Sequence, residues 1–185
     1  MRTGSIEKLS GHVEVDESYI GGLESNKHKS KRSPNLGGDK TAVMGMVERG
    51  GNVVAKVINN SGSKVLQSNI RGHVAKDAVL FTDQHTGYTS IGYEYLHLTV
   101  NHSEKEYVRG NVHTNTVEGF FGLFKRCIKG TYIHMAPFHI DRYLDEQCLR
   151  YNLRKSNDGN RFEHVTSQVV GRHLTYKELT GKAAA

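Results

Sequence analysis

The stretch that decides the fold lies near the N-terminus and reads His12-Val13-Glu14-Val15-Asp16-Glu17-Ser18-Tyr19-Ile20-Gly21-Gly22. Apolar and polar residues alternate along it, which is typical of a strand with one buried face, and the two glycines predict a turn. Asp16 closes the apolar part of the pattern. A carboxylate at the end of an apolar strand is costly to bury unless it is paired or bound to a metal. The stretch therefore predicts a first strand and a candidate site residue together.

Four further segments are rich in β-branched or apolar residues and are expected to be strands; they cover residues 41–48, 52–58, 78–83 and 95–100. Arg49-Gly50-Gly51 separates the first two, which predicts a hairpin. The strand over 78–83 stops at a second acid, Asp83. Residues 24–40 hold Lys, Arg, Ser, Asn, Pro and Gly and are typical of a mobile basic loop.

Apolar residues that recur every three or four positions predict helices between and after these strands. The expected helices cover residues 61–74, 115–128 and 137–151, with a short helical or turn segment over 85–92. A serine, Ser61 or Ser63, is expected to cap the first helix, and Thr114, Asn115 or Thr116 the second. Three strands followed by alternating helices and strands predict an α/β protein. The order is that of the RNase H-like fold, a mixed five-stranded sheet flanked by helices.

Composition narrows the class of protein. The 185 residues suit one domain with a sizeable core, and 25 Lys and Arg against 19 Asp and Glu give a net charge of +6. This excess favours an anionic partner, of which nucleic acid is the commonest. Cys127 and Cys148 form neither a disulfide framework nor a zinc ligand set, so buried free thiols in a reducing cytosol are expected. No apolar run is long enough to span a membrane, and no secretory signal is present, which predicts a cytoplasmic protein.

Three acids stand where a metal site would need them. Asp16 and Asp83 end strand patterns, and Glu118 opens the helix expected from residue 115. Carboxylate oxygens of this kind are the ligands that Mg²⁺ prefers, and two such ions promote in-line phosphoryl displacement. Asp83 and Glu118 have 34 residues between them, the separation that names the "DD35E" pattern of transposases and integrases. The alternative is that each acid is an ordinary turn or cap residue.

The residues around the acids are more specific than their spacing. Val13 to Gly22, Phe81-Thr82-Asp83 with Tyr88 following, and His113-Thr114-Asn115-Thr116-Val117-Glu118 with Lys125 further on resemble the ISXO-type transposases of bacterial insertion sequences, members of the DDE superfamily. The resemblance implies that Asp16, Asp83 and Glu118 bind two Mg²⁺ ions, for which Mn²⁺ can substitute. It also implies that Lys125 is their basic partner in catalysis.

Several side chains are expected to assist the acids. Glu118 and Lys125 are seven residues apart, which returns to nearly the same helix face after two turns. The resemblance implies that His113 and Asn115 support the acids without binding metal themselves, with a helix cap as the alternative role of Asn115. Glu17 should point to the opposite face of its strand. DNA contacts are expected from basic residues, with a solvated charge run as the alternative; these residues are Lys27, Lys29, Lys31, Arg32, Lys125, Arg126 and Lys129.

The sequence thus predicts a transposase catalytic domain over residues 11–155, with terminal extensions at 1–10 and 156–185. Its expected activity is metal-dependent DNA strand cleavage and strand transfer, by a dimer on DNA in the bacterial cytoplasm, associated with the nucleoid. The N-terminal DNA-recognition domain that the family usually carries is expected to be absent. Two alternatives remain open: an RNase H-like nuclease without joining activity, and a catalytically silent DNA-binding module. No HExxH, Walker or dinucleotide-binding motif favours another class.

Overall fold

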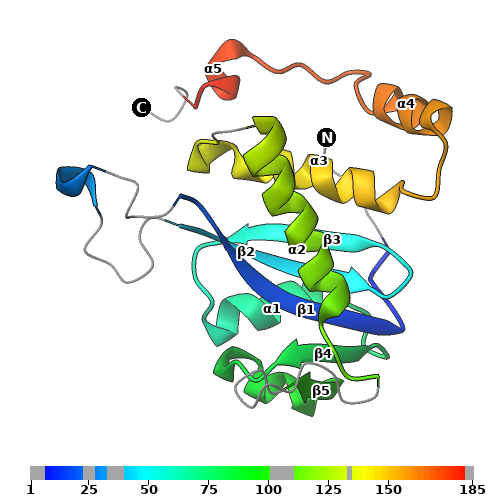
Figure 1. The fold of residues 1–185 in the computed structure, drawn as a ribbon. Coiled ribbons are helices and arrows are strands. Elements are labelled where there is room, and N and C mark those ends of the chain that lie inside the picture. The colour runs from blue at the N-terminus through cyan, green and yellow to red at the C-terminus, as the bar shows by residue number, and fades with distance from the viewer. Residues whose placement is uncertain (1–6, 23–27, 33–39, 101–110, 133–134, 182–185) are drawn as a thin grey trace.

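A mixed sheet of five strands forms the centre of the protein (Figure 1). The computed structural model describes residues 7–22, 28–32, 40–100, 111–132 and 135–181. The strands are β1 (His12–Ile20), β2 (Thr41–Glu48), β3 (Val53–Ile58), β4 (Val79–Asp83) and β5 (Leu96–Val100). They lie in the order β3-β2-β1-β4-β5. β1, β2 and β3 pair in antiparallel fashion, whereas β4 and β5 run parallel to β1.

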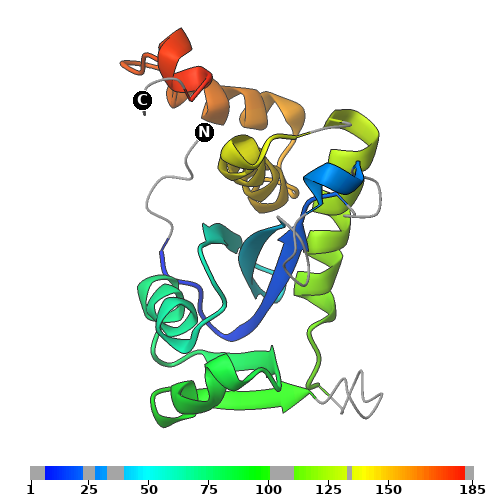
Figure 2. The same ribbon diagram turned by 90° about the vertical axis from the view of Figure 1, so that its left-hand side faces the viewer.

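Helices cover both faces of this sheet. The α-helices are α1 (Ser63–His73), α2 (Asn115–Cys127), α3 (Ile140–Asn152), α4 (Asp158–Ser167) and α5 (Tyr176–Leu179). Shorter turns of 3-10 helix are η2 (Lys29–Lys31), η3 (Thr86–Tyr93) and η6 (Pro137–His139), and a π-helical turn, η5 (Ile128–Tyr132), extends α2. The view in Figure 2 shows α1 on one side of the sheet and α2 on the other.

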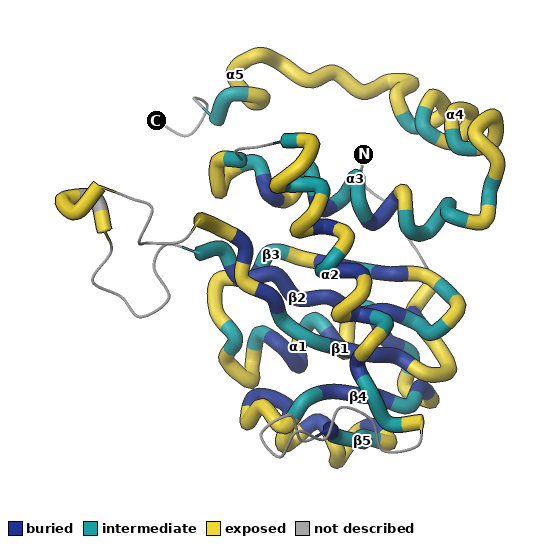
Figure 3. Tube along the Cα trace, viewed as in Figure 1, coloured by how far each residue is buried: buried dark blue, intermediate teal, exposed yellow. Residues whose placement is uncertain are grey.

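Alternate residues of the central strands point into two separate apolar cores. On β2, Met44 and Met46 belong to the core that α1 and η3 complete, whereas Val43 and Val47 belong to the core that α2 and α3 complete. Because both faces are covered, every residue of β2 between its two ends is buried, as Figure 3 shows for the middle of the sheet. A strand buried on both faces has a near-continuous apolar sequence, and this is why the sequence of β2 predicts a strand.

A side chain of α3 pairs with the first residue on the free edge of β3. The Asn152 amide, at the end of α3, accepts a hydrogen bond from Val53 N–H at 2.7 Å and donates one to Val53 C=O at 3.0 Å. An unpaired edge invites pairing with another strand, and this contact satisfies both backbone groups of one edge residue. It also fixes the end of α3 against the sheet.

The predicted RNase H-like α/β fold is confirmed, with the five strands and the two long helices within a few residues of their expected positions. Other expectations were wrong. Neither Ser61 nor Ser63 caps α1, because its N-cap is Gly62 and no side chain bonds the first turn. Lys29–Lys31 form a helical turn inside the segment expected to be a loop. Among the described residues, no helix has the length and apolar composition needed to cross a bilayer.

The C-terminal segment contains two helices that the sequence did not predict. α4 and α5 bury none of their residues, and the exposed colouring in Figure 3 runs along most of this segment. α4 is fastened by Arg161, which donates hydrogen bonds to the carbonyls of Leu153 and Arg154 at 3.1 Å each. With no buried face, these helices have no apolar periodicity from which they could be recognised.

Candidate active site

The ladder between β1 and β4 places Asp16 and Asp83 at neighbouring positions. Its last pair is Glu14 with Phe81, and the two aspartates lie two residues further along their strands. Because side chains alternate along a strand, both lie on the face of the sheet to which Glu14 and Phe81 point. Asp16 was expected to end its strand, and this was wrong: β1 continues to Ile20, paired with β2 alone. Asp16 therefore lies in mid-strand, where the neighbouring strand β4 ends.

Glu118 comes from the helix that covers this face. It lies in the first turn of α2, where its N–H bonds the Thr114 carbonyl at 3.1 Å and its Oε1 accepts a hydrogen bond from Thr114 Oγ1 at 2.9 Å. Buried Val117 and Phe121 of the same helix pack against β2 at Gly45, where an added Cβ would lie 2.8 Å from Phe121 Cζ. Close packing of helix and strand thus brings Glu118 toward the strand acids.

The charges of the other acids act on the Asp16 carboxyl. Burial raises the pKa of the Asp16 carboxyl from its ordinary 3.8 to about 7. A hydrogen bond from Glu17 N–H, 2.8 Å from Asp16 Oδ1, lowers this pKa, while the negative charges of Glu17, Asp83 and Glu118 raise it further. Carboxylates that share a site raise one another's pKa in this way. Asp16 therefore lies within electrostatic reach of both other predicted ligands.

The donor set suits a hard divalent cation, because it consists of carboxylate oxygens contributed by three separate elements. Within the described part of the chain, no three His, Cys, Asp or Glu side chains are gathered tightly enough to bind a metal as they stand. Asp83 Oδ1 instead accepts a hydrogen bond from His85 N–H at 3.1 Å, and Glu118 bonds Thr114. Metal binding would require these carboxylates to turn toward one another.

A fourth acid, Glu17, lies beside Asp16 on the opposite face of β1. The Tyr88 hydroxyl, in the core on the α1 side, donates a short hydrogen bond to Glu17 Oε1. Burial raises the pKa of Glu17 to about 7; the bond from Tyr88 lowers it, and the charge of Asp83 raises it. The prediction that Glu17 points away from the metal ligands agrees with this contact.

The start of α2 is held by a residue that sequence reasoning missed. Glu14 on β1 is fully buried and bonds the N–H groups of Thr116 and Val117, at 2.7 and 3.1 Å. None of Thr114, Asn115 and Thr116 caps the helix through its own side chain as expected, because the N-cap, Thr114, makes no such bond. Glu14 occupies a polar position of the alternating pattern, where side chains are ordinarily exposed.

The predicted supporting residues differ in their surroundings. His113 Nδ1 lies 3.2 Å from Glu14 Oε1 and 3.3 Å from Arg49 Nη2, so it belongs to the ionic cluster beneath the start of α2. Asn115 is the first residue of α2 and is exposed.

The basic residues expected to bind DNA lie on two parts of the surface. Lys125 and Arg126 are exposed on the last turn of α2, and Lys129 is exposed on the π-helical turn that follows. Lys29 and Arg32 are exposed at η2. Lys27 and the side chain of Lys31 lie outside the described residues.

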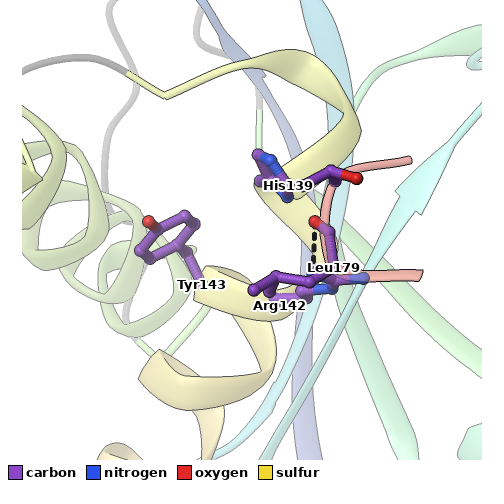
Figure 4. A pocket seen from close by; sticks show the side chains of 5 residues that line it. His139, Arg142, Tyr143 and Leu179 are labelled. Atoms are coloured by element: carbon purple, nitrogen blue, oxygen red, sulfur yellow. Dashed lines mark hydrogen bonds between the residues drawn. The ribbon is translucent and has the colours of Figure 1, made fainter. Parts of the chain in front are cut away.

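A shallow hollow lies elsewhere, between α3 and α5. It is lined by His139, Arg142, Tyr143, Leu179 and Thr180. The Arg142 guanidinium donates to the carbonyls of Leu179 and Glu178, at 3.1 and 2.8 Å, as Figure 4 shows for the first of these. Its charged group is thus used to fasten α5, and the hollow includes none of the predicted site residues.

Comparison with known proteins identifies the family of the chain. A family model described as the ISXO2-like transposase domain matches residues 8–152, which span all five strands, α1, α2 and α3. Comparison with the curated proteins gave no match.

Proposed function

Because the chain belongs to the ISXO2-like transposase domain family, we propose that it cleaves DNA strands and joins them to a target, using divalent metal ions held by Asp16, Asp83 and Glu118. One observation carries this proposal. Asp16 and Asp83 lie at neighbouring strand positions on one face of the sheet, and Glu118 lies in the first turn of the helix over that face, near enough for Asp83 and Glu118 to raise the pKa of Asp16. Perturbed carboxyls that cluster on one face are typical of functional sites.

The reaction consists of two displacements at phosphorus. Water first attacks a phosphodiester at the end of the element and leaves a free 3′-hydroxyl. That hydroxyl then attacks a phosphodiester of the target, displaces its 3′-oxygen and joins the strands. Two bound Mg²⁺ ions, or Mn²⁺ in their place, would activate the attacking oxygen and stabilise the leaving one.

The protein's own contribution begins with the protonation of Asp16. With a pKa of about 7, this carboxyl carries a proton in part of the molecules at neutral pH. It has to release that proton before it can bind a cation, so metal binding should become weaker as the pH falls. The hydrogen bond from Glu17 N–H to Asp16 Oδ1 favours the ionised carboxylate, which is the form that binds a cation.

DNA is the proposed partner, bound through the surface that carries Lys125, Arg126 and Lys129. These residues follow Glu118 along α2 and its π-helical extension. A DNA strand lying along the helix would therefore contact these basic side chains and also reach the three acids with their metal ions. The net charge of +6 favours a polyanion. Pairing of two DNA ends calls for two copies of the chain, and a dimer on DNA is part of the proposal.

The test compares wild type with Asp83→Ala and with Asp158→Ala, whose side chain on α4 is 96% exposed. Mn²⁺ binding is measured by calorimetry, and nicking and joining of plasmid DNA by gel electrophoresis. Wild type and Asp158→Ala should bind Mn²⁺ and process DNA, and Asp83→Ala should do neither while remaining folded. Nicking without joining would favour the nuclease, and metal-independent DNA binding without any cleavage would favour the silent binding module.

A further inference from the structure

The buried carboxylate of Glu14 connects the strand that carries Asp16 to the helix that carries Glu118. Both of its oxygens are used. Oε2 accepts from Thr116 N–H and Val117 N–H at 2.7 and 3.1 Å, and Oε1 accepts from Thr116 Oγ1 at 2.9 Å. The bonded amides are the second and third of the helix, the ones that a side-chain cap normally satisfies. Glu14 therefore caps α2 from another element, and Glu118 is the residue immediately after the capped pair.

Arg49, in the turn directly after β2, balances the charge of Glu14 and extends the connection. Its Nε donates to Glu14 Oε1 at 2.6 Å. Its other two nitrogens donate to the carbonyls of Asn111 and His113, at 2.8 and 2.9 Å, just before α2 begins. The guanidinium also lies 4.1 Å from the centre of the Phe81 ring on β4. One ion pair thus contacts β1, β4 and the residues that lead into α2.

Burying a carboxylate costs free energy, so a fully buried one calls for a reason in the structure. Glu14 is 0% exposed, and the cost of burying its charge is offset by the ion pair with Arg49, by three further hydrogen bonds from hydroxyl and amide donors, and by the positive end of the helix dipole. An apolar residue with an ordinary serine cap on α2 would fill the same space without charge. An apolar residue, however, could not hydrogen-bond the first turn of α2, so it would not fix the distance between that turn and β1.

We propose that Glu14 is a positioning residue, which holds Glu118 at the distance from Asp16 and Asp83 that a shared metal site requires. This inference rests on the proposed function. Glu14 is two residues from Asp16 on the same face of β1 and accepts a hydrogen bond from the amide of Val117, next to Glu118, so it connects β1 beside Asp16 directly to the first turn of α2. Residues that orient metal ligands typically contribute about 10- to 100-fold to metal affinity.

The test uses Glu14→Gln, which keeps the shape of the side chain but replaces one carboxylate oxygen, an acceptor, with an NH₂ group, a donor. That NH₂ group would face either the helix amides or Arg49, and both are donors. Asn152→Ala is the matched control, since it removes two hydrogen bonds of similar length between a helix and the far edge of the same sheet. Arg49→Lys is a second variant for the case in which Glu14→Gln does not fold, because it keeps the charge and loses the bonds to Asn111 and His113.

Three quantities are measured on each full-length protein: stability in urea, the Mn²⁺ dissociation constant with the electron paramagnetic resonance spectrum of bound Mn²⁺, and amide hydrogen exchange in the first turn of α2. Glu14→Gln should weaken Mn²⁺ binding about 10-fold or more, alter the spectrum and speed exchange at Thr116 and Val117. Asn152→Ala should lose comparable stability and keep the wild-type affinity and spectrum. Affinity that falls equally in both variants, or in neither, would overturn the proposal.

Failure of the proposed metal site is distinguishable from failure of this inference. If wild type binds no Mn²⁺, the proposed function fails and the exchange rates alone decide whether Glu14 positions the helix. Faster exchange confined to the start of α2 in Glu14→Gln or Arg49→Lys then supports the positioning role. Unchanged exchange there overturns it.

Discussion

Gly45 is the residue directly opposite Asp16 in the ladder between β1 and β2. Its missing side chain leaves the space into which Phe121 and Val117 of α2 pack, since an added Cβ would lie 2.8 Å from Phe121 Cζ and 3.1 Å from Val117 Cγ2. The helix therefore packs closely on β2 beside the first of the predicted metal ligands.

Gly45→Ala should accordingly move α2 away from Asp16. Overpacking of this kind costs about 1–3 kcal/mol of unfolding free energy, and Mn²⁺ affinity should fall with it. Gly72→Ala on α1 is the control, because an added Cβ there meets nothing within 4 Å and alanine favours helix by about 0.5–1 kcal/mol. Urea unfolding and calorimetry measure both effects. Equal behaviour of the two variants would show that the close approach at Gly45 has no role in the site.

The pKa of Asp16 predicts how stability depends on pH. A carboxyl whose pKa rises from 3.8 to about 7 on folding binds more protons in the folded state. Its stabilising contribution is thus complete below about pH 4 and is lost as the pH rises through about 7. Asp16→Asn, which resembles the protonated form, should exceed wild type at pH 8 by on the order of 1–3 kcal/mol, with the difference vanishing toward pH 4. Urea unfolding at pH 4, 6 and 8 measures this, and a difference independent of pH would contradict it.

Metal addition should reverse the loss of stability at high pH. Protons and cations compete for the same carboxylates, so Mn²⁺ should raise the melting temperature at pH 8 and far less at pH 5. At 100 times the dissociation constant, the increase for a domain of this size is about 5–10 °C. Differential scanning calorimetry checks this, with Asp83→Ala expected to show no increase at either pH. A shift retained in that variant would place the ion elsewhere.

Some helices and strands of this fold could be predicted from the sequence, and others could not. β2 was predictable because its apolar run is nearly continuous, as in a strand buried on both faces, and α2 because its apolar residues repeat with the period of a helix with one buried face. α4 and α5 have no buried face and left no such signal. The prediction that Ser61 or Ser63 caps α1 was wrong because the helix begins after Gly62 without any side-chain hydrogen bond to its first turn.

The candidate site was only partly predictable for a related reason. Asp16, Asp83 and Glu118 were identifiable from the motifs around them, and their roles as metal ligands stay predictions. Glu14 stands one strand period before Asp16, at a position that the alternating pattern assigns to solvent. Its burial depends on Arg49 and on the start of α2, which lie 35 and about 100 residues away. Local patterns cannot reveal a partner at that separation.

Lys125→Ala should weaken DNA binding without affecting the metal site. Each phosphate contact that is lost should reduce the slope of log affinity against log salt by about 0.9. Lys64→Ala removes an exposed lysine on α1, across the sheet from α2, and should leave the slope unchanged. Fluorescence anisotropy with a DNA duplex at several salt concentrations measures the slopes. Identical slopes for the two variants would remove Lys125 from the proposed DNA surface.

Removal of residues 156–185 should leave a cooperatively folding domain. α4 and α5 bury none of their residues, and the family match ends at residue 152, the last residue of α3. The hydrogen bonds from Arg161 and Arg142 would be lost, at a cost of about 1 kcal/mol each at most. Urea unfolding of residues 1–155 measures the change, and loss of a single cooperative transition would show that the tail belongs to the core domain.

The capping of α2 by Glu14 also has a consequence for the order of folding. The two bonded residues are 102 positions apart in the chain, and contacts between such distant residues form late because loop closure is costly. A first helical turn is hard to nucleate alone, so α2 should become stable only after β1 has entered the sheet. Glu14→Gln should therefore speed unfolding and leave the folding rate nearly unchanged. A partly folded chain would carry the two strand acids without the helix acid, and the complete triad would exist only in the finished protein.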